Sequence, residues 1–225
     1  MKREIINTGD GSTTIHLPEW NEQYHSIHGA IQEARHVFIE MGLKKAMENN
    51  PDEISILEIG FGTGLNALVS WQEARHKQVK ILYAGIEAYP VDANEVKRLN
   101  FSAEIKEKGA GAIFELLHTS PWEIPQQLTT GFLLHKQKKF FEEIDEISKY
   151  DLVYFDAFGA RIQPELWTAA IFSKMFQALK PGGILVTYAA KGSVRRAMIE
   201  VGFTVEKLPG PPGKREMLRA SKISA

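Results

Sequence analysis

The chain contains no cysteine. This absence excludes disulfide-stapled scaffolds, thiol nucleophiles and thiolate-ligated zinc or iron-sulfur sites. Long apolar runs are also missing, since none approaches the ~20 residues that cross a bilayer, and no apolar signal segment follows Met1-Lys2-Arg3-Glu4. We therefore expect a soluble, unexported protein of the cytoplasm.

Neither sign of charge dominates the whole sequence, whose formal net charge is -1. The charges are nevertheless unevenly distributed, because residues 174–225 hold ten Lys and Arg residues against three Glu residues. A basic C-terminal segment is typical of a surface that faces an anionic partner. A solvated face on an otherwise acidic domain has the same composition, so charge alone does not decide between the two.

The 225 residues, 44% of them hydrophobic, are enough to build one large core. Neither a repeat nor a flexible linker divides the sequence, so we predict a single domain over residues 1–225. Residues 1–50 are interpreted as an N-terminal extension. It contains a hairpin of residues 4–8 and 13–17 around a turn at Asp10-Gly11, and then a helix over residues 27–49.

From residue 51 onward, short apolar runs alternate with helical segments, which indicates buried parallel strands and crossover helices. We predict strands at residues 54–59, 81–87, 152–155 and 184–188, and helices at residues 65–75, 92–99, 164–179 and 194–201. Residues 204–208 and 216–220 indicate a closing antiparallel hairpin. The pattern in residues 103–148 is less clear, and we expect one strand and a short helix within residues 132–141. The predicted fold class is α/β, a mostly parallel sheet with helices on both faces.

The most specific motif is the run Glu58-Ile59-Gly60-Phe61-Gly62-Thr63-Gly64-Leu65-Asn66, a strand that leads through three glycines into a helix. Glycines at such a junction let a ligand approach the backbone, and the helix N-terminus offers free N–H groups. A dinucleotide-binding fingerprint would need its third glycine at Leu65, and the sequence has no Walker-type phosphate loop. The motif resembles motif I of the class I S-adenosylmethionine (SAM) dependent methyltransferases, whose Rossmann-like fold it implies.

Two acidic residues end strands at the edge of the sheet where open α/β folds bind ligands. Glu87 is placed to accept the ribose hydroxyls of a nucleoside ligand. Asp156-Ala157-Phe158 resembles the Asp/Asn-Pro-Pro-Phe/Tyr signature of methyltransferases that act on amino nitrogen. Asp156 can bind a cationic amine and help deprotonate it, and Phe158 can offer a ring face to the charge. Asp156 could instead cap the following helix or pair with Arg161.

A longer ordered series is similar to one family, the methyltransferase domain of the bifunctional enzyme that completes 5-methylaminomethyl-2-thiouridine at the tRNA wobble position. The series includes Tyr24-His25-Ser26, Gly60 to Asn66, Asp156-Ala157-Phe158, Gly192 to Arg196 and Lys214 to Leu218. The resemblance implies methyl transfer from SAM to the exocyclic amine of 5-aminomethyl-(2-thio)uridine. It also implies the tRNA anticodon stem-loop as partner, and upstream enzymes that make the aminomethyl group. The family's FAD oxidase domain has no counterpart here, so we expect a stand-alone form.

The resemblance also assigns roles to single residues. The cofactor-binding residues would be Gly60, Phe61, Gly62, Gly64 and Glu87, with Asn66 and Glu33 supporting the amino-acid moiety of SAM. Asp156 and Phe158 would face the amine. The RNA phosphates would be bound by Lys191, Arg195, Arg196, Lys214 and Arg215. The modified base has to leave its stack, so Tyr188 or Trp167 could stack on it, although a packed core role suits Trp167 better.

Other positions depart from the family or leave its pattern open. Where the family commonly has a Gly-Asp pair near the adenine, this chain reads Lys138-Lys139-Phe140, so the adenine contacts stay unassigned. Arg161 could touch RNA or hold Asp156. The N-terminal histidines lack metal-ligand spacing, so we expect no metal, and His25 could reach the SAM pocket.

Three alternatives remain open at this point. The first is a SAM-dependent methyltransferase of a small-molecule or protein amine. The second is a non-catalytic RNA-binding protein on a methyltransferase fold. An aminopropyl transferase of the same fold is disfavoured, because the series that resembles the tRNA enzyme is so complete.

Overall fold

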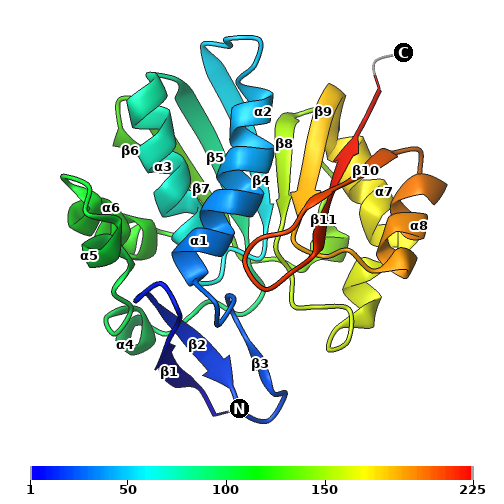
Figure 1. Ribbon diagram of the computed structural model, residues 1–225. Helices are drawn as coiled ribbons and strands as arrows, with labels where there is room; N and C mark the ends of the chain where they lie inside the picture. Colours follow the sequence, from blue (N-terminus) through cyan, green and yellow to red (C-terminus); the bar gives the residue numbers. More distant parts are fainter. Residues whose placement is uncertain (1, 224–225) are drawn as a thin grey trace.

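An eight-stranded sheet forms the centre of the molecule in the computed structural model, which describes residues 2–223 (Figure 1). The strand order is β10-β11-β9-β8-β4-β5-β7-β6. The parallel strands are β4 (Glu53–Ile59), β5 (Lys80–Ile86), β7 (Phe132–Gln137), β8 (Tyr150–Phe155) and β9 (Leu179–Thr187). The antiparallel strands are β6 (Gln126–Thr129), β10 (Thr204–Pro209) and β11 (Glu216–Ser221). The predicted mostly parallel sheet and closing hairpin are confirmed.

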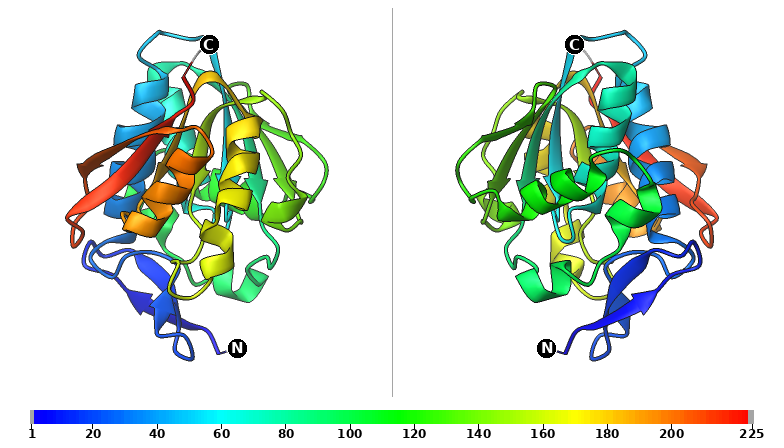
Figure 2. Two further views of the ribbon diagram at one scale, coloured as in Figure 1. Left: turned by 90° about the vertical axis from the view of Figure 1, so that its right-hand side faces the viewer. Right: turned by 90° about the vertical axis from the view of Figure 1, so that its left-hand side faces the viewer.

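Helices cover both faces of this sheet, as predicted (Figure 2). The first face carries α1 (Ala30–Ala34), the π-helix η1 (Arg35–Leu43), α2 (Lys44–Ala46), α3 (Leu65–Lys77), α5 (Phe101–Ile105) and α6 (Ala110–Thr119). The second face carries α7 (Ala169–Ala178) and α8 (Gly192–Glu200). The short elements are α4 (Ala93–Val96) and the 3-10 turns η2 (Phe141–Glu143) and η3 (Pro164–Trp167).

Side-chain alternation along the central strands builds the two cores. On β8, Leu152 and Tyr154 enter the core of the first face, whereas Val153 and Phe155 enter the core of the second. Such strands read as continuous apolar runs because both of their faces are covered. Glu58 interrupts this rule on β4, since it is a completely buried carboxyl group within an apolar strand.

The order of the strands places the ligand-binding edge. β4 pairs with β5 on one side and with β8 on the other, so Ile59 is in register with both Ile86 and Phe155. The chain therefore changes direction across the sheet next to β4, and the loops after these three strands emerge side by side. Crevices at such switch points are where open α/β sheets bind ligands.

The N-terminal residues form a separate three-stranded sheet beyond the carboxyl ends of the parallel strands (Figure 1). It consists of β1 (Glu4–Asn7), β2 (Thr13–Leu17) and the short β3 (Glu22–Gln23). The predicted hairpin is confirmed, and β3 extends it. Two hydrogen bonds from Thr13 to Asn100 Oδ1, at 2.8 and 3.1 Å, attach this sheet to the start of α5. The sheet is thereby held over the ligand-binding edge.

Several predicted helix limits differ from the structure. The N-terminal helix begins at Ala30 rather than at residue 27, because residues 26–29 form a turn in which the Gly29 N–H donates to Ser26 O. The helix expected at 92–99 ends at Val96. The helix expected at 164–179 is broken at Thr168, whose backbone is extended.

Residues 103–148 also contain more structure than the sequence indicated. The expected strand within 132–141 is present as β7, whereas the short helix is the 3-10 turn η2, which begins only at Phe141. The elements α6 and β6 precede them. Within residues 2–223, none of the helices is both long enough and apolar enough to cross a membrane.

Candidate active site

A cleft of about 670 Å³ opens at the carboxyl ends of β4, β5 and β8. Its floor is the glycine loop after β4, and its walls come from the N-terminal sheet and from the loops after β5, β7, β8 and β9. This volume lies in the range of small-molecule and cofactor sites. The cleft brings together the predicted residues Gly60, Phe61, Gly62, Asn66, Glu87, Asp156 and Phe158.

The glycine loop makes a tight turn between its two neighbouring strands. Gly60 and Gly62 have φ angles of 90° and 47°, in the left-handed region that favours glycine. A Cβ atom on Gly60 would lie 2.8 Å from the Asp156 carbonyl oxygen, so no side chain fits there. Gly64, also left-handed, is the N-cap of α3. The turn therefore leaves bare backbone facing the cleft.

Phe61 stabilises this loop from behind. Its ring is buried against Trp122 and His118, at centroid distances of 6.2 Å each. The Phe61 N–H donates to Ile86 O at 2.9 Å. Any cofactor contact of Phe61 thus depends on the position of its backbone.

Glu87 links the ends of β4 and β5. Its carboxylate accepts the Gly62 N–H at 3.0 Å and the Tyr89 N–H at 2.8 Å. These bonds hold the Glu87 carboxylate beside the glycine loop and within the cleft lining. The geometry suits an acceptor of ribose hydroxyls, the role expected from the sequence.

Asp156 stands at the end of β8, with its N–H donating to Ile59 O at 2.9 Å. Its side chain is partly exposed to the cleft and accepts a hydrogen bond from Asn66 Nδ2 at 2.8 Å. Burial by the surrounding protein, with a further contribution from the negative charge of Glu33, raises the pKa of Asp156 to about 7. Asp156 caps neither of the helices that follow, whose N-caps are Gln163 and Thr168.

Asn66 lies behind Asp156 in the first turn of α3. Its Nδ2 also donates to Glu58 Oε1 at 2.8 Å, and its Oδ1 has no partner among the described residues. Burial raises the pKa of Glu58 well above its ordinary value, which favours the neutral form of this carboxyl group. A direct contact of Asn66 with SAM stays a prediction.

Aromatic side chains form the wall beside Asp156. The Phe158 ring packs edge-on against Trp20 and Tyr24, at centroid distances of 5.8 and 5.0 Å. Tyr188 also lines the cleft, and its hydroxyl donates to Ala157 O at 2.8 Å. The sequence analysis did not assign Trp20 to the site. The available signal was the presence of an aromatic residue in the loop after a predicted hairpin.

Trp167 is buried behind this wall. Its Nε1 donates to Phe158 O at 2.8 Å, and its ring packs on Phe155 at 5.0 Å. Trp167 is absent from the cleft lining, whereas Tyr188 is part of it. Of the two aromatics considered for base stacking, only Tyr188 is therefore accessible to a ligand.

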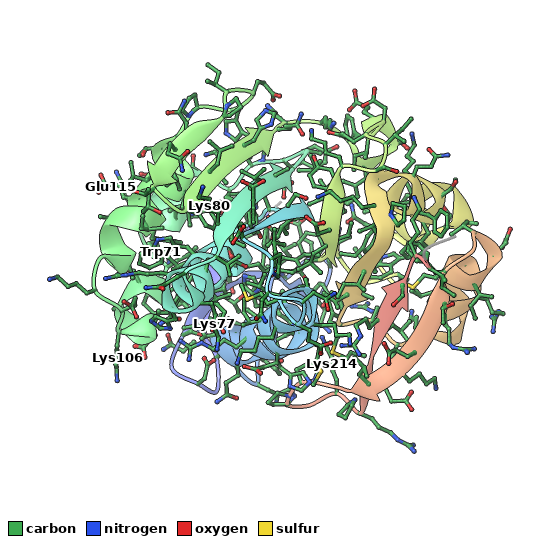
Figure 3. The ribbon with its side chains drawn as sticks, turned by 90° about the horizontal axis from the view of Figure 1, so that it is seen from above. Trp71, Lys77, Lys80, Lys106, Glu115 and Lys214 are labelled. Carbon is green, nitrogen blue, oxygen red and sulfur yellow. The ribbon has the colours of Figure 1, made fainter. Side chains whose placement is uncertain are left out.

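Lys214 reaches into the site from the β10–β11 loop. Its Nζ pairs with Glu33 at 2.5 Å and lies 3.9 Å from the centroid of the Tyr188 ring. Glu33 also accepts the Ser26 N–H at 2.8 Å. Figure 3 shows Lys214 between the N-terminal helix and the C-terminal hairpin. Lys214, which was predicted to bind RNA, and Glu33, which was predicted to support SAM, thus form an ion pair with each other.

The other predicted RNA-binding residues lie on the surface. Lys191, Arg196 and Arg215 are exposed and Arg195 is half-buried. Among the described residues, none of these four cations forms an ion pair. Their positions leave them available to phosphate groups.

His25 is a neutral element of the cleft wall. It is buried, and its Nε2 lies 2.6 Å from Thr63 Oγ1 in the glycine loop. Burial lowers the pKa of His25 to about 4, so the ring is uncharged at neutral pH. In the part of the chain that the structure describes, no group of three His, Asp or Glu side chains is arranged to hold a metal ion.

Arg161 connects two walls of the cleft. It pairs with Glu22 at 3.2 Å and donates to the carbonyl oxygens of Trp20 and Asn21 at 3.4 and 3.3 Å. The alternative in which Arg161 holds Asp156 is therefore not what the structure shows.

The segment that departs from the family pattern forms the far wall of the cleft. Lys139 pairs with Glu146 at 3.3 Å, whereas Phe140 is exposed and lines the cleft. The Phe140 ring lies edge-on to Tyr89, at a centroid distance of 6.0 Å. Next to Glu87 the wall is therefore aromatic.

Comparison with known proteins identifies the class to which this architecture belongs. Residues 117–223 match the family described as S-adenosyl-L-methionine-dependent methyltransferase. Spermidine synthase from Thermotoga maritima has a TM-score of 0.60 at 14% identity, a likeness of fold alone. The strand order and the glycine loop are those of the class I SAM-dependent methyltransferase fold, and the family match over residues 117–223 agrees with this fold.

Three relatives are similar to this chain over most of its length. MNMC2 from Aquifex aeolicus is 27% identical with a TM-score of 0.80, over 100% of this chain and 71% of that one. The tRNA 5-methylaminomethyl-2-thiouridine biosynthesis bifunctional protein MnmC of Acidovorax sp. is 29% identical over 92% of this chain, and that of Polaromonas naphthalenivorans is 29% identical over 96%. The chain spans only 34% and 35% of the length of these two relatives.

Proposed function

We propose that this protein transfers a methyl group from SAM to the exocyclic amine of 5-aminomethyl-(2-thio)uridine at the wobble position of tRNA, in the cytoplasm. The similarity to proteins named for 5-methylaminomethyl-2-thiouridine biosynthesis supports this substrate. The observation that carries the proposal is the position of Asp156, which stands between the glycine loop and an aromatic wall. An amine held there is next to the cofactor-binding backbone.

The residues of the cleft fit the cofactor. Gly60 and Gly62 present backbone without side chains to the cleft, and Glu87 presents a fixed carboxylate beside them. Gly64 lies outside the cleft lining, where a Cβ atom would face His118 and Phe61. When bound, SAM supplies an electrophilic methyl group on its sulfonium.

Asp156 provides the chemistry that an amine substrate requires. An alkylammonium has no lone pair, so it has to lose a proton before its nitrogen can form a bond to carbon. Ionised Asp156 binds the ammonium, accepts one proton and leaves the nitrogen lone pair free to attack. Its raised pKa of about 7 makes this carboxylate a better base than an exposed aspartate.

The aromatic wall fits a base that has left its stack. Phe158, Tyr188 and Trp20 line the cleft around Asp156, so an uracil ring can pack against them while its aminomethyl group reaches the carboxylate. Removal from the duplex or loop stack has a cost of a few kcal/mol, which stacking on aromatic side chains offsets.

Basic residues outside the cleft fit an RNA backbone. Lys191, Arg195 and Arg196 belong to the start of α8, which follows the cleft residue Tyr188 by only a few positions. Their charges have no carboxylate partner among residues 2–223. Phosphates of an anticodon stem-loop would bind here while the base enters the cleft.

A panel of acceptors tests this function. The protein is incubated with methyl-labelled SAM and either aminomethyl-bearing tRNA, a polyamine or a lysine-rich peptide. We expect label in the tRNA alone, and none in tRNA whose wobble uridine lacks the aminomethyl group. Label in the polyamine or peptide, without label in the tRNA, would assign another amine as the substrate.

A further inference from the structure

One side-chain nitrogen of Asn66 joins two carboxyl groups. Asn66 Nδ2 lies 2.8 Å from Glu58 Oε1 and 2.8 Å from Asp156 Oδ2. An amide nitrogen carries two hydrogens, so each carboxyl group receives one of them. This pairing determines which end of the amide is nitrogen, and it leaves Oδ1 without a partner in residues 2–223.

The two ends of this bridge differ in environment. Glu58 is 0% exposed on β4, and its Oε1 accepts the hydrogen bond from Asn66. Asp156 is open to the cleft and can change charge there. Asn66 itself is 2% exposed, so its orientation is set by the protein rather than by water. The Glu58 end of the bridge is therefore fixed inside the protein, whereas the Asp156 end faces the cleft.

We infer that Asn66 is a positioning residue, which uses Glu58 as an anchor and holds the Asp156 carboxylate in the orientation that receives the substrate amine. This inference rests on the proposed function and adds a residue to it. A hydrogen bond from a neutral donor favours the ionised form of a carboxyl group, most strongly where water is excluded. Asn66 thus keeps Asp156 ionised near neutral pH, against the effect of burial.

Other charged groups around Asp156 oppose or assist this effect. Glu33 on α1 disfavours the ionised form of Asp156, whereas Lys214 in the β10–β11 loop favours it. Glu58 on β4, Tyr83 on β5 and Tyr188 after β9 also interact electrostatically with Asp156. All of these groups remain when Asn66 alone is changed, so a variant of Asn66 isolates the contribution of its hydrogen bond.

The test compares three variants by the pH dependence of kcat/KM on aminomethyl-bearing tRNA and by the Kd for SAM. Asn66→Ala removes the bond, and we expect the acidic limb of the profile to move up by about one pH unit, with kcat at saturating SAM reduced. Glu58→Gln retains an acceptor oxygen for Asn66, so its acidic limb should move less than that of Asn66→Ala. Asn66→Asp, of the same size, should shift the limb in the same direction, which keeps the test valid if Asn66→Ala does not fold.

Ser55→Ala is the matched control. Ser55 is a buried residue that donates a hydrogen bond to the Asp151 carboxylate at 2.6 Å, on the same strand as Glu58 but at its opposite end. This variant should lose stability without any change in the pH profile.

Two results would overturn the inference. An unchanged acidic limb in both Asn66 variants would show that the bridge does not hold Asp156. A weakened SAM Kd with normal kcat at saturating SAM would assign Asn66 to the cofactor instead. Failure of the wild-type protein to methylate the tRNA would be a separate outcome, because it removes the proposed function itself.

Discussion

Lys214 Nζ lies 3.9 Å from the centroid of the Tyr188 ring, and the same ammonium group pairs with Glu33. The contact brings a loop near the C-terminus against the N-terminal helix and against the wall of the cleft. It also places a positive charge where it favours the ionised form of Asp156. Lys214 therefore belongs to the electrostatics of the site, in addition to any contact it makes with RNA.

Replacement of this lysine should change the pH profile. In Lys214→Met the cation that favours ionised Asp156 is lost, so the pKa of Asp156 rises and the acidic limb of kcat/KM moves to higher pH. The salt dependence of tRNA binding should stay close to that of the wild type. A profile that matches the wild type would show that Lys214 has no electrostatic influence on Asp156.

Replacement of the surface cations should change tRNA binding and leave the pH profile unchanged. In the triple variant Lys191→Ala, Arg195→Ala, Arg196→Ala, we expect weaker tRNA binding, with the slope of log K against log salt reduced by about 0.7–0.9 for each phosphate that the protein no longer neutralises. The acidic limb should stay in place. Filter binding between 50 and 200 mM salt is the measurement, and an unchanged slope would move the RNA-binding surface elsewhere.

Asp156 itself sets the pH at which the enzyme works. Its folded-state pKa of about 7 means that the carboxylate form needed for amine binding is lost as the pH falls through that value. We expect wild-type kcat/KM to rise across neutral pH. Asp156→Asn should reduce kcat by about 10²–10⁴, the range of general acid–base catalysis, with SAM affinity retained in calorimetry. Substantial turnover in this variant would contradict the assigned role.

Glu87 should matter for the cofactor rather than for the amine. Glu87→Ala removes the acceptor of the Gly62 N–H and the carboxylate that faces the ribose, so we expect SAM affinity to fall by about tenfold or more. Glu53→Ala, an exposed acid at the other end of the sheet, is the control. Equal SAM Kd values for both variants would exclude Glu87 from the cofactor site.

Glu58 should make the protein less stable as the pH rises. Its pKa is higher in the folded than in the unfolded state, so its stabilising contribution is complete below the unfolded-state pKa and is lost as the pH rises toward the folded-state value. Glu58→Gln has no such loss. In urea unfolding, its advantage over the wild type should grow by up to about 1.4 kcal/mol per pH unit above the unfolded-state pKa. A constant difference would indicate that Glu58 is ionised in the fold.

The sequence was most informative where a local pattern fixes the structure. The run from Glu58 to Asn66 contains its own strand, turn and helix start, so its fold and position were predictable. The strand that precedes Asp156 was equally clear, because it is apolar on both faces. The break at Thr168 and the π-helix were not visible, since the apolar residues around each still recur at intervals close to those of an α-helix. The organisation as one domain stays a prediction.

The site was less predictable than the fold, because its contacts join distant parts of the chain. Asn66 and Asp156 are 90 positions apart, and Lys214 and Glu33 are 181 positions apart. No local pattern shows that a lysine in a basic segment turns inward to a buried glutamate. The roles of single residues in binding SAM, amine and RNA remain predictions that the variants above address.

Nucleoside analysis of the product tests the central claim most directly. The protein and SAM are incubated with two tRNA pools, one that carries unmethylated 5-aminomethyl-2-thiouridine and one that is fully modified, and the digested nucleosides are separated by mass. We predict 5-methylaminomethyl-2-thiouridine formed from the first pool and no new methylation in the second. Absence of this nucleoside, with SAM still bound to the protein, would contradict the claim that wobble uridine is the substrate.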